Sequence, residues 1–182
     1  MRSNKTVFSS KDIALLWQES NPQAARTRLN YYVKKGELYH PRKGLYTKNK
    51  NYNPLELATR IFTPAYVSFE SALAIEGVIF QHYATIFVAS YLTREITIDN
   101  RSYSFKKIKI DILVNPMGIE QVNETSIATK ERAFLDTLYL NTDYYFDNLR
   151  SLDWDKVSQL LPIYNNKRLA KVVTKLRREN QT

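Results

Sequence analysis

Residues 21–48 combine strong positive charge with side chains that can read DNA bases. Seven lysines and arginines stand in this stretch against one acid, Glu37. On a helix over residues 22–35, the most polar side presents Gln23, Arg26, Thr27, Asn30 and Lys34. Arginine can bond O6 and N7 of guanine together, and asparagine or glutamine can do the same with adenine. We therefore expect this side of the helix to enter the major groove of DNA, its N-terminal residues first.

The flanks of this helix and the segment after it carry further groups suited to phosphate. Arg28, Tyr31 and Lys35 lie at the edges of the polar side. Arg42 and Lys43 fall in the turn "PRKG", from which they could reach the DNA backbone or the minor groove. The alternative interpretation is a basic helix that is merely solvated.

Capping signals define the elements that must position these side chains. Ser9 and Asp12 match the start of a helix that holds "KDIALLWQ". Asn21 and Pro22 begin the second helix, and Gly36 ends it. Its apolar residues recur at helical spacing and are expected to pack against Ile13 and Leu16 of the first helix; they are Ala25, Leu29, Tyr32 and Val33.

Two short strands, 37–40 and 45–48, follow the second helix and are joined by "PRKG". Helix, turn, helix and basic hairpin is the order of a winged helix-turn-helix. Such domains usually begin with one more helix, for which only "MRSNKTVF" is left. That helix is therefore missing, replaced by a strand, or supplied by the rest of the chain.

The polar stretch "KNKNYNP" near residue 50 suggests a linker between two domains, 1–50 and 51–182. The second should be an α+β domain, with a small β-sheet flanked by helices. Residues 85–114 look like β-structure, including a hairpin over 94–105 and an alternating strand over 107–114 with Ile108, Ile110, Ile112 and Val114 on one face. Helices are expected over 54–62, 68–77, 129–140, 153–161 and 165–178.

Charge is divided in the same way along the chain. The net charge is +9, of which residues 1–50 contribute +8, residues 51–164 contribute −4 and residues 165–182 contribute +5. A basic head on a mildly acidic body is expected when one part binds a polyanion.

The sequence contains no cysteine, no long apolar run and no apolar signal-peptide core. These features favour a cytoplasmic protein without membrane association.

Four stretches resemble the AbiEi-type antitoxins, which are transcriptional autoregulators of abortive-infection toxin–antitoxin pairs. They are "RKGLY" (42–46), "YNPLELA" (52–58), "YVSFESALAIEGV" (66–78) and "SIATKERAFLDTLYL" (126–140). The last is similar to the family's Ala-small-x-Glu-Lys/Arg-Ala-x-x-Asp pattern through Ala128, Thr129, Glu131, Arg132, Ala133 and Asp136. The resemblance implies an N-terminal DNA-binding domain and a C-terminal domain that counters a nucleotidyltransferase-like toxin, often without a stable complex.

Two further groups of charged residues have two interpretations each. Glu131, Arg132 and Asp136 form either a structural ion pair or a contact surface for the toxin or its substrate. The final helix has a packing face of Leu169, Val172, Val173 and Leu176, and an opposite side with Lys167, Lys171, Lys175 and Arg178. That side is either a solvated face or a second surface that contacts phosphate or RNA. Lys167, Lys171 and Lys175 are also candidates for the surface through which an antitoxin acts.

An enzymatic function has little support in the sequence. His40 and His82 have no partners at metal-ligand spacing, and Asp153 and Asp155 are better explained as the start of a helix. The four glycines are too far apart for a phosphate-binding loop. We expect no catalytic set, no metal and no cofactor.

The sequence therefore predicts a repressor of its own promoter that is also the antitoxin of a toxin–antitoxin pair. One recognition helix reads only a few base pairs, so we expect two copies on repeated half-sites, assembling as a homodimer on DNA. The alternative is a stand-alone winged-helix transcription factor whose second domain dimerises or senses a ligand. An RNA-modifying enzyme is a third class, without a visible active site.

Overall fold

The protein has a mixed α and β fold, which confirms the predicted α+β class. The computed structural model describes residues 5–180, so the first four residues of "MRSNKTVF" lie outside the described part. The described residues form eight α-helices, two short 3-10 helices and two sheets. The α-helices are α1 (Ser10–Leu16), α2 (Pro22–Lys34), α3 (Pro54–Ile61), α4 (Phe69–Ile75), α5 (Ile110–Leu113), α6 (Lys130–Leu140), α7 (Trp154–Leu160) and α8 (Lys167–Asn180). The 3-10 helices are η1 (Leu149–Ser151) and η2 (Leu161–Tyr164). The strands are β1 (Val7–Ser9), β2 (Tyr39–Arg42), β3 (Leu45–Thr47), β4 (Ala65–Val67), β5 (Ile86–Ser90), β6 (Arg94–Ile98), β7 (Arg101–Lys107), β8 (Ile119–Val122) and β9 (Thr125–Ala128).

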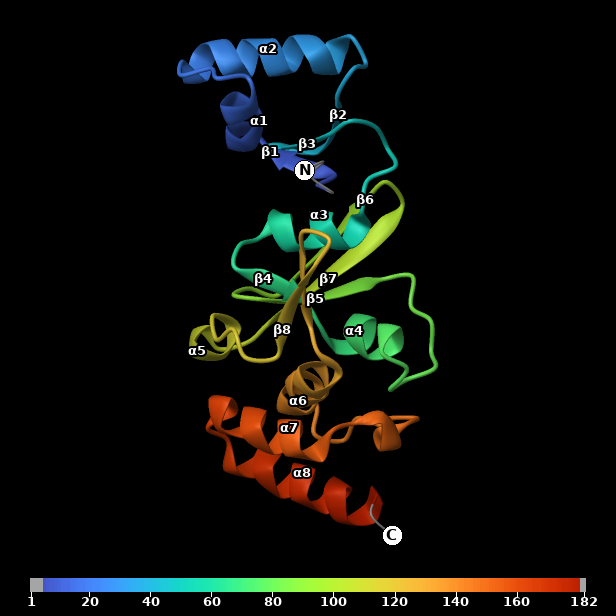
Figure 1. The fold of residues 1–182 in the computed structure, drawn as a ribbon. Helices are drawn as coiled ribbons and strands as arrows, with labels where there is room; N and C mark the ends of the chain where they lie inside the picture. Colours follow the sequence, from blue (N-terminus) through green and yellow to red (C-terminus); the bar gives the residue numbers. More distant parts are fainter. Residues whose placement is uncertain (1–4, 181–182) are drawn as a thin grey trace.

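Residues 7–47 form a group at one end of the molecule, which we call the head, and residues 54–180 form the body (Figure 1). The head has an antiparallel sheet of order β1-β3-β2, with α1 and α2 beside it. Its capping predictions are confirmed. Ser9 and Asp12 form a capping box at α1, and the side chain of Asn21 accepts two backbone N–H groups at the start of α2. A strand, β1, occupies the place before α1.

The predicted hairpin of the head is present, but its turn is shorter than predicted. Pro41 and Arg42 belong to strand β2, and the chain reverses at Lys43 and Gly44, where Gly44 has a φ of 82°. Proline lacks the N–H that a central strand needs, and for this reason it reads as a turn residue. Here β2 is the edge of its sheet, and its register with β3 shifts between Tyr39 and Arg42; a strand tolerates proline at an edge or at such an irregularity.

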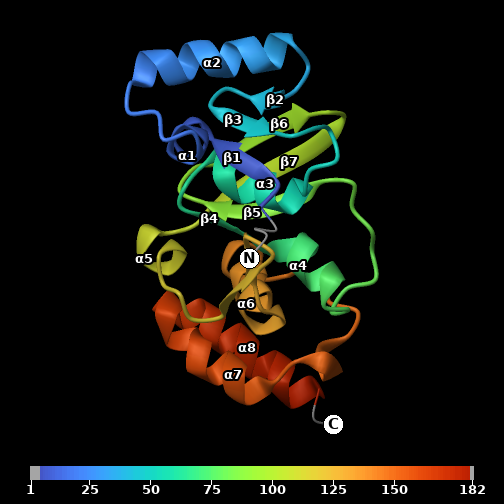
Figure 2. The ribbon, with the colours of Figure 1, turned by 45° about the horizontal axis from the view of Figure 1, so that its top comes forward.

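A six-stranded mixed sheet of order β6-β7-β5-β4-β9-β8 is the centre of the body. The predicted hairpin β6–β7 is confirmed, and its turn residues Asp99 and Asn100 both have positive φ, as in two-residue hairpin turns. Helix α3 lies between this sheet and the head, and α6, α7 and α8 follow on the far side (Figures 1 and 2). The hairpin β8–β9 and the strand β4 were not predicted.

The predicted strand over 107–114 is wrong. Strand β7 ends at Lys107, and the short helix α5 follows after two residues. Ile108 and Ile112 are buried, whereas Ile110 and Val114 are more than half exposed. Every second residue from 108 to 114 is apolar, which suggests a strand. Of these four, the structure buries only Ile108 and Ile112, which are four apart, and it also buries Leu113, which would lie on the other face of a strand.

Apolar contacts cross the proposed boundary near residue 50. Val7 and Leu45 of the head share one buried cluster with Leu57 and Ala58 of α3 and with Val88 of β5. The end of the predicted linker is ordered as well, since its Asn53 caps α3 through its side chain. The division into domains 1–50 and 51–182 therefore stays a prediction, and a cut there would expose part of this shared core.

We call the contact between the head and the body the joint. A buried carboxylate at its centre holds the head on the body. Glu56 of α3 is fully buried. It accepts hydrogen bonds from the backbone N–H (2.8 Å) and hydroxyl (2.7 Å) of Thr6, and from the Val7 N–H (3.2 Å). Arg60 Nε donates to the same carboxylate at 3.1 Å. One acidic side chain of the body thus fixes the start of the first strand of the head.

Charged and aromatic contacts extend this joint on both sides. The Arg60 guanidinium lies 3.8 Å from the Asp12 carboxylate of α1. The hydroxyls of Tyr39 and Tyr52 both donate to Asp99 in the β6–β7 turn. Burial raises the pKa of Asp99, but these two hydrogen bonds and the positive charge of Lys50 together outweigh it, so that the pKa lies below its ordinary value. The joint is therefore polar at its rim, and its centre combines the apolar cluster with the paired carboxylate of Glu56.

Candidate nucleic-acid interface

Helix α2 lies at the outer end of the head (Figure 1). The predicted base-reading side chains all fall on its exposed side. They are Gln23, Arg26, Thr27, Asn30 and Lys34, and each is exposed. Ala25 and Leu29 on the opposite side are buried, where Leu29 packs with Ile13 and Tyr46. The helix is therefore docked by one stripe and presents the other to solvent. We call the exposed set the α2 polar face.

The predicted packing of α2 on α1 is half correct. Ile13 is buried against α2, but Leu16 is 68% exposed. Trp17 takes the place predicted for Leu16, one turn after Ile13 and partly buried in the same cluster. Helix α1 has only seven residues, so its contact with the crossing helix is limited to one narrow stripe.

The flanking residues Arg28, Tyr31 and Lys35 are exposed as well. The Arg28 guanidinium lies 4.4 Å from the centroid of the Trp17 ring, a cation–π contact that restricts its orientation. Lys35 forms an ion pair with Glu37 at 2.7 Å, and the hydrogen bond from this lysine raises its pKa. A phosphate that binds Lys35 must therefore compete with Glu37, whereas Arg28 is already held in place.

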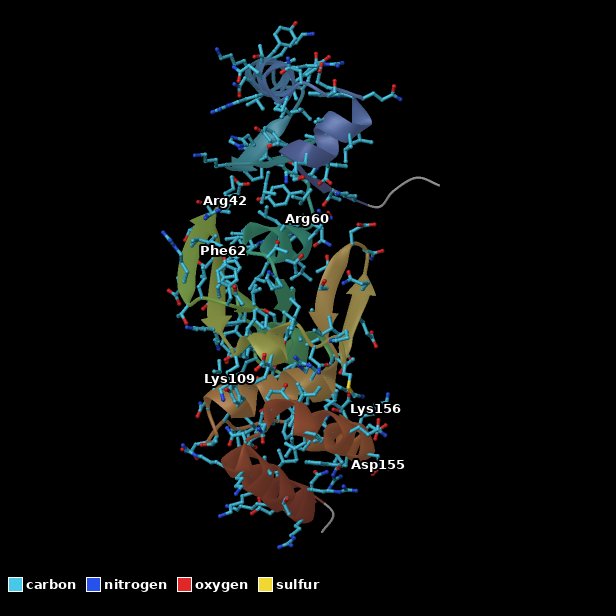
Figure 3. The ribbon with its side chains drawn as sticks, turned by 90° about the vertical axis from the view of Figure 1, so that its left-hand side faces the viewer. Arg42, Arg60, Phe62, Lys109, Asp155 and Lys156 are labelled. Carbon is cyan, nitrogen blue, oxygen red and sulfur yellow. The ribbon has the colours of Figure 1, made fainter. Side chains whose placement is uncertain are left out.

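The two basic residues of the hairpin, Arg42 and Lys43, lie in different surroundings. Lys43 is exposed at the turn. Arg42 is only partly exposed, and its guanidinium lies 5.4 Å from the centroid of Phe62 in the body. Figure 3 shows Arg42 at the junction of head and body, directly above Phe62 and away from α2. The structure thus brings Arg42 to the joint and not to the α2 polar face.

Glu131, Arg132 and Asp136 lie inside the body. All three are at most 2% exposed, so the interpretation as a contact surface is corrected: no part of this group is available to a partner on the surface. Arg132 Nε lies 3.4 Å from Asp136 Oδ1, one turn along α6. The Glu131 carboxylate accepts the backbone N–H of Asp153 at 3.2 Å. Arg132 and Asp136 thus form the structural ion pair that the sequence suggested as the first possibility, and Glu131 has a separate structural role.

Hydroxyls and carbonyls complete the surroundings of this ion pair. The Asp136 carboxylate accepts hydrogen bonds from Tyr66 (2.9 Å), Ser68 (2.8 Å) and Tyr164 (2.7 Å). Arg132 donates to the carbonyls of Ile112 (2.5 Å) and Met117 (2.8 Å) and to the Tyr66 hydroxyl. Burial raises the pKa of Asp136, while Arg132 and the three hydroxyls oppose that rise and favour the carboxylate. Ser68 begins α4 as predicted, but its hydroxyl serves Asp136 and does not cap the helix.

Gly118 lies against this pair and gives a prediction for stability. Its φ is 73°, and a Cβ there would come 2.9 Å from Arg132 Cβ and 3.1 Å from a methyl group of Leu160. We expect Gly118→Ala to lower the free energy of unfolding by about 1–3 kcal/mol, because it combines overpacking with a left-handed backbone. Urea denaturation measures this. Gly77→Ala is the matched control, since its φ is 67° but its Cβ would meet nothing within 4 Å. Equal losses in both variants would show that contact with Arg132 is unimportant.

The last helix presents its predicted sides as expected. Leu169 and Val173 are buried and Val172 and Leu176 are partly buried against the body, while Lys167, Lys171, Lys175 and Arg178 are exposed.

Within residues 5–180, no cluster of acidic or histidine side chains could hold a metal ion. No described helix has the length and apolar character needed to cross a membrane. Asp153 caps α7 with its side chain, as predicted.

Several residues that shape these sites were not found by sequence reasoning. Trp17 holds Arg28, Phe62 holds Arg42, and Tyr66 and Tyr164 complete the Asp136 site. Aromatic residues at core spacing give no local sign of such contacts. For Asp136 a signal did exist, because an acid in an apolar helix needs partners.

Comparisons with known proteins give no assignment. No protein family model matches this chain, and no curated protein matches it in sequence. The similarity to AbiEi-type antitoxins therefore depends on the four stretches quoted above.

Proposed function

We propose that this protein is a DNA-binding autorepressor that also acts as the antitoxin of a pair with a nucleotidyltransferase-like toxin. The α2 polar face carries the first half of the proposal. Its five donor-rich side chains are exposed together, on a helix whose other side is buried. The order β1, α1, α2, β2, β3 supports assigning the head as a winged helix-turn-helix that has a strand in place of its first helix.

The test of DNA binding is the double variant Arg26→Ala, Asn30→Ala. Each change is expected to cost about 1–3 kcal/mol of binding free energy to the protein's own promoter, if each side chain bonds a base edge. Both side chains are exposed, so the fold should remain intact. Fluorescence anisotropy on the promoter duplex, with circular dichroism as the check on folding, measures the effect.

Lys109→Ala is the matched control for this test, because Lys109 is an exposed cation of the body (Figure 3). It should leave promoter affinity unchanged. A double variant that binds the promoter like the wild type would show that α2 is not the recognition helix. Footprinting should reveal two half-sites whose centres lie about 34 Å or a multiple apart.

The antitoxin half of the proposal is supported by the sequence stretches and needs a separate test. A neighbouring reading frame that is toxic alone and harmless with this protein would support it. The promoter-binding variant above should still relieve toxicity if neutralisation and repression are separate. The burial of Glu131, Arg132 and Asp136 means that any direct contact with a toxin must use other residues.

A further inference from the structure

Helix α8 presents a row of cations that the proposed function of the head does not use. Lys167, Lys171 and Lys175 follow one another at four-residue spacing on the exposed side, and we call these three the α8 row. Successive members are about 6 Å apart along the helix axis. Two nucleotides of one DNA strand span about 7 Å, so the row can follow a phosphate backbone.

Two other cations of α8, Arg168 and Arg177, are engaged with the body, whereas the three lysines of the row are exposed to solvent. Arg168 donates to the Thr142 hydroxyl at 2.6 Å, and Arg177 lies 3.3 Å from the Asp155 carboxylate. Within the row, Lys175 has a nearby acid, Glu179, at 3.7 Å, and both of these side chains are mostly exposed. An exposed pair of this kind contributes little, so Glu179 is a weak competitor for a phosphate.

The packing of α8 argues against a membrane surface as its partner. An amphipathic helix binds a membrane by inserting its apolar face between lipids. The apolar face of α8 is already buried, with Leu169 at 0% and Val173 at 5% exposure. Only the basic side remains exposed to a partner, and it can make electrostatic contacts but cannot insert apolar side chains between lipids.

The composition of the exposed side distinguishes among nucleic acids. Proteins that hold single strands stack the bases on aromatic side chains. Helix α8 contains no aromatic residue, and its exposed side consists of lysine, arginine, threonine and glutamate. Its first turns contain no asparagine or glutamine that could read bases, and the side chain of Asn166, just before the helix, accepts the backbone N–H groups of Arg168 and Leu169. Lysine ammonium groups on a regular helix fit a duplex backbone without sequence preference.

We propose that the α8 row is a second surface for double-stranded DNA, which binds phosphates irrespective of sequence. Helices α2 and α8 lie at opposite ends of the molecule (Figures 1 and 2). One protomer therefore holds two separate duplex segments, its promoter through the head and a second segment through α8. This bridging rests on the proposed function of the head, whereas binding by α8 does not.

The first experiment measures binding to a random 30-base-pair duplex in a background that lacks three side chains of the α2 polar face, through Arg26→Ala, Asn30→Ala and Lys34→Ala. Into it we introduce Lys167→Gln, Lys171→Gln, Lys175→Gln. The slope of log affinity against log salt should become less steep by roughly 2 to 3, because each phosphate that a lysine neutralises contributes about 0.9 to the slope. The control is Arg94→Gln, Lys107→Gln, Lys109→Gln, which removes the same charge from exposed positions of the body and should leave the slope unchanged.

The second experiment tests bridging with the complete protein. Beads that carry the promoter duplex should capture a labelled, unrelated duplex through the wild type. The α8 variant should still bind the beads and should lose the capture, while the control variant retains it. Capture by the α8 variant at the wild-type level would overturn the proposal.

Two further outcomes separate the proposal from its alternatives. If the α8 changes weaken binding to polyglutamate but leave the DNA slope equal to that of the control, the surface fits an acidic protein and the proposal is wrong. If the wild type shows no preference for its promoter while duplex binding still depends on the α8 row, the proposed function of the head fails and the α8 surface stands.

Discussion

Replacing Arg132 with methionine is expected to lower the free energy of unfolding by about 3–5 kcal/mol. Arg132 and Asp136 are both fully buried and paired. Methionine fills similar volume but leaves the Asp136 carboxylate without its counter-charge, and the carbonyls of Ile112 and Met117 without a donor. An uncompensated buried charge costs more than the pair itself contributes. Chemical denaturation followed by circular dichroism measures the loss.

The loss should depend on pH in a definite direction. Burial raises the pKa of Asp136 in the folded state, and the charge of Arg132 opposes this rise. Without Arg132, the pKa in the folded state should therefore lie further above its value in the unfolded state. A raised pKa in the folded state stabilises at low pH, and that stabilisation disappears as the pH rises through it. The deficit of the variant relative to wild type should therefore be smaller at pH 5 than at pH 8.

Two controls make this prediction specific to the pair. Arg150→Met removes an exposed arginine and should change stability by less than about 0.5 kcal/mol. The double variant Arg132→Met, Asp136→Leu removes both charges, and it should lose less than the sum of the two single variants, with a coupling of about 0.5–3 kcal/mol. Strict additivity would mean that the two side chains do not stabilise each other.

Replacing Glu56 with glutamine is expected to destabilise the protein by about 3 kcal/mol and to loosen the head from the body. Four donors from Thr6, Val7 and Arg60 point at this carboxylate. An amide supplies one oxygen, and its nitrogen is itself a donor, so several of these groups lose their acceptor. Each buried donor without a partner costs about 1–3 kcal/mol, and a charged donor costs more.

Amide hydrogen exchange shows where in the chain the Glu56→Gln change acts and also measures how much it destabilises the protein. The backbone N–H groups of Thr6 and Val7 should lose protection first, because they bond directly to Glu56. Glu120→Gln, at an exposed position of β8, is the matched control and should leave both stability and exchange unchanged. Unaltered protection at Thr6 and Val7 in the Glu56 variant would show that this carboxylate does not hold the first strand.

Local signals in the sequence determined the helices and turns that matter most for the proposed function. Asn21, Pro22 and Gly36 specify the two ends of α2, and its apolar spacing specifies which side is docked. Asp99 and Asn100 specify the β6–β7 turn, because their short polar side chains tolerate positive φ. These signals act over three or four residues, so they can be read without knowing what lies across the fold.

The pattern over residues 107–114 shows where local signals stop. Its alternation fits a strand, yet α5 forms, because the interior accepts Ile108 and Ile112 and leaves Ile110 and Val114 outside. The sequence contains both patterns at once. Which one is used depends on the surface that the segment packs against.

The tertiary structure alone decided the partners of the charged residues. The sequence required a partner for Asp136 but could not supply Tyr66, Ser68 and Tyr164, which lie between 28 and 70 residues away along the chain. It could not place Arg42 on Phe62, or Glu56 beneath the first strand. A charge or a ring has the same local sequence signature whether it faces water or another element. Its role is set by distances that exist only once the chain has folded, and these distances separate an exposed basic surface from a charged side chain that holds the fold together.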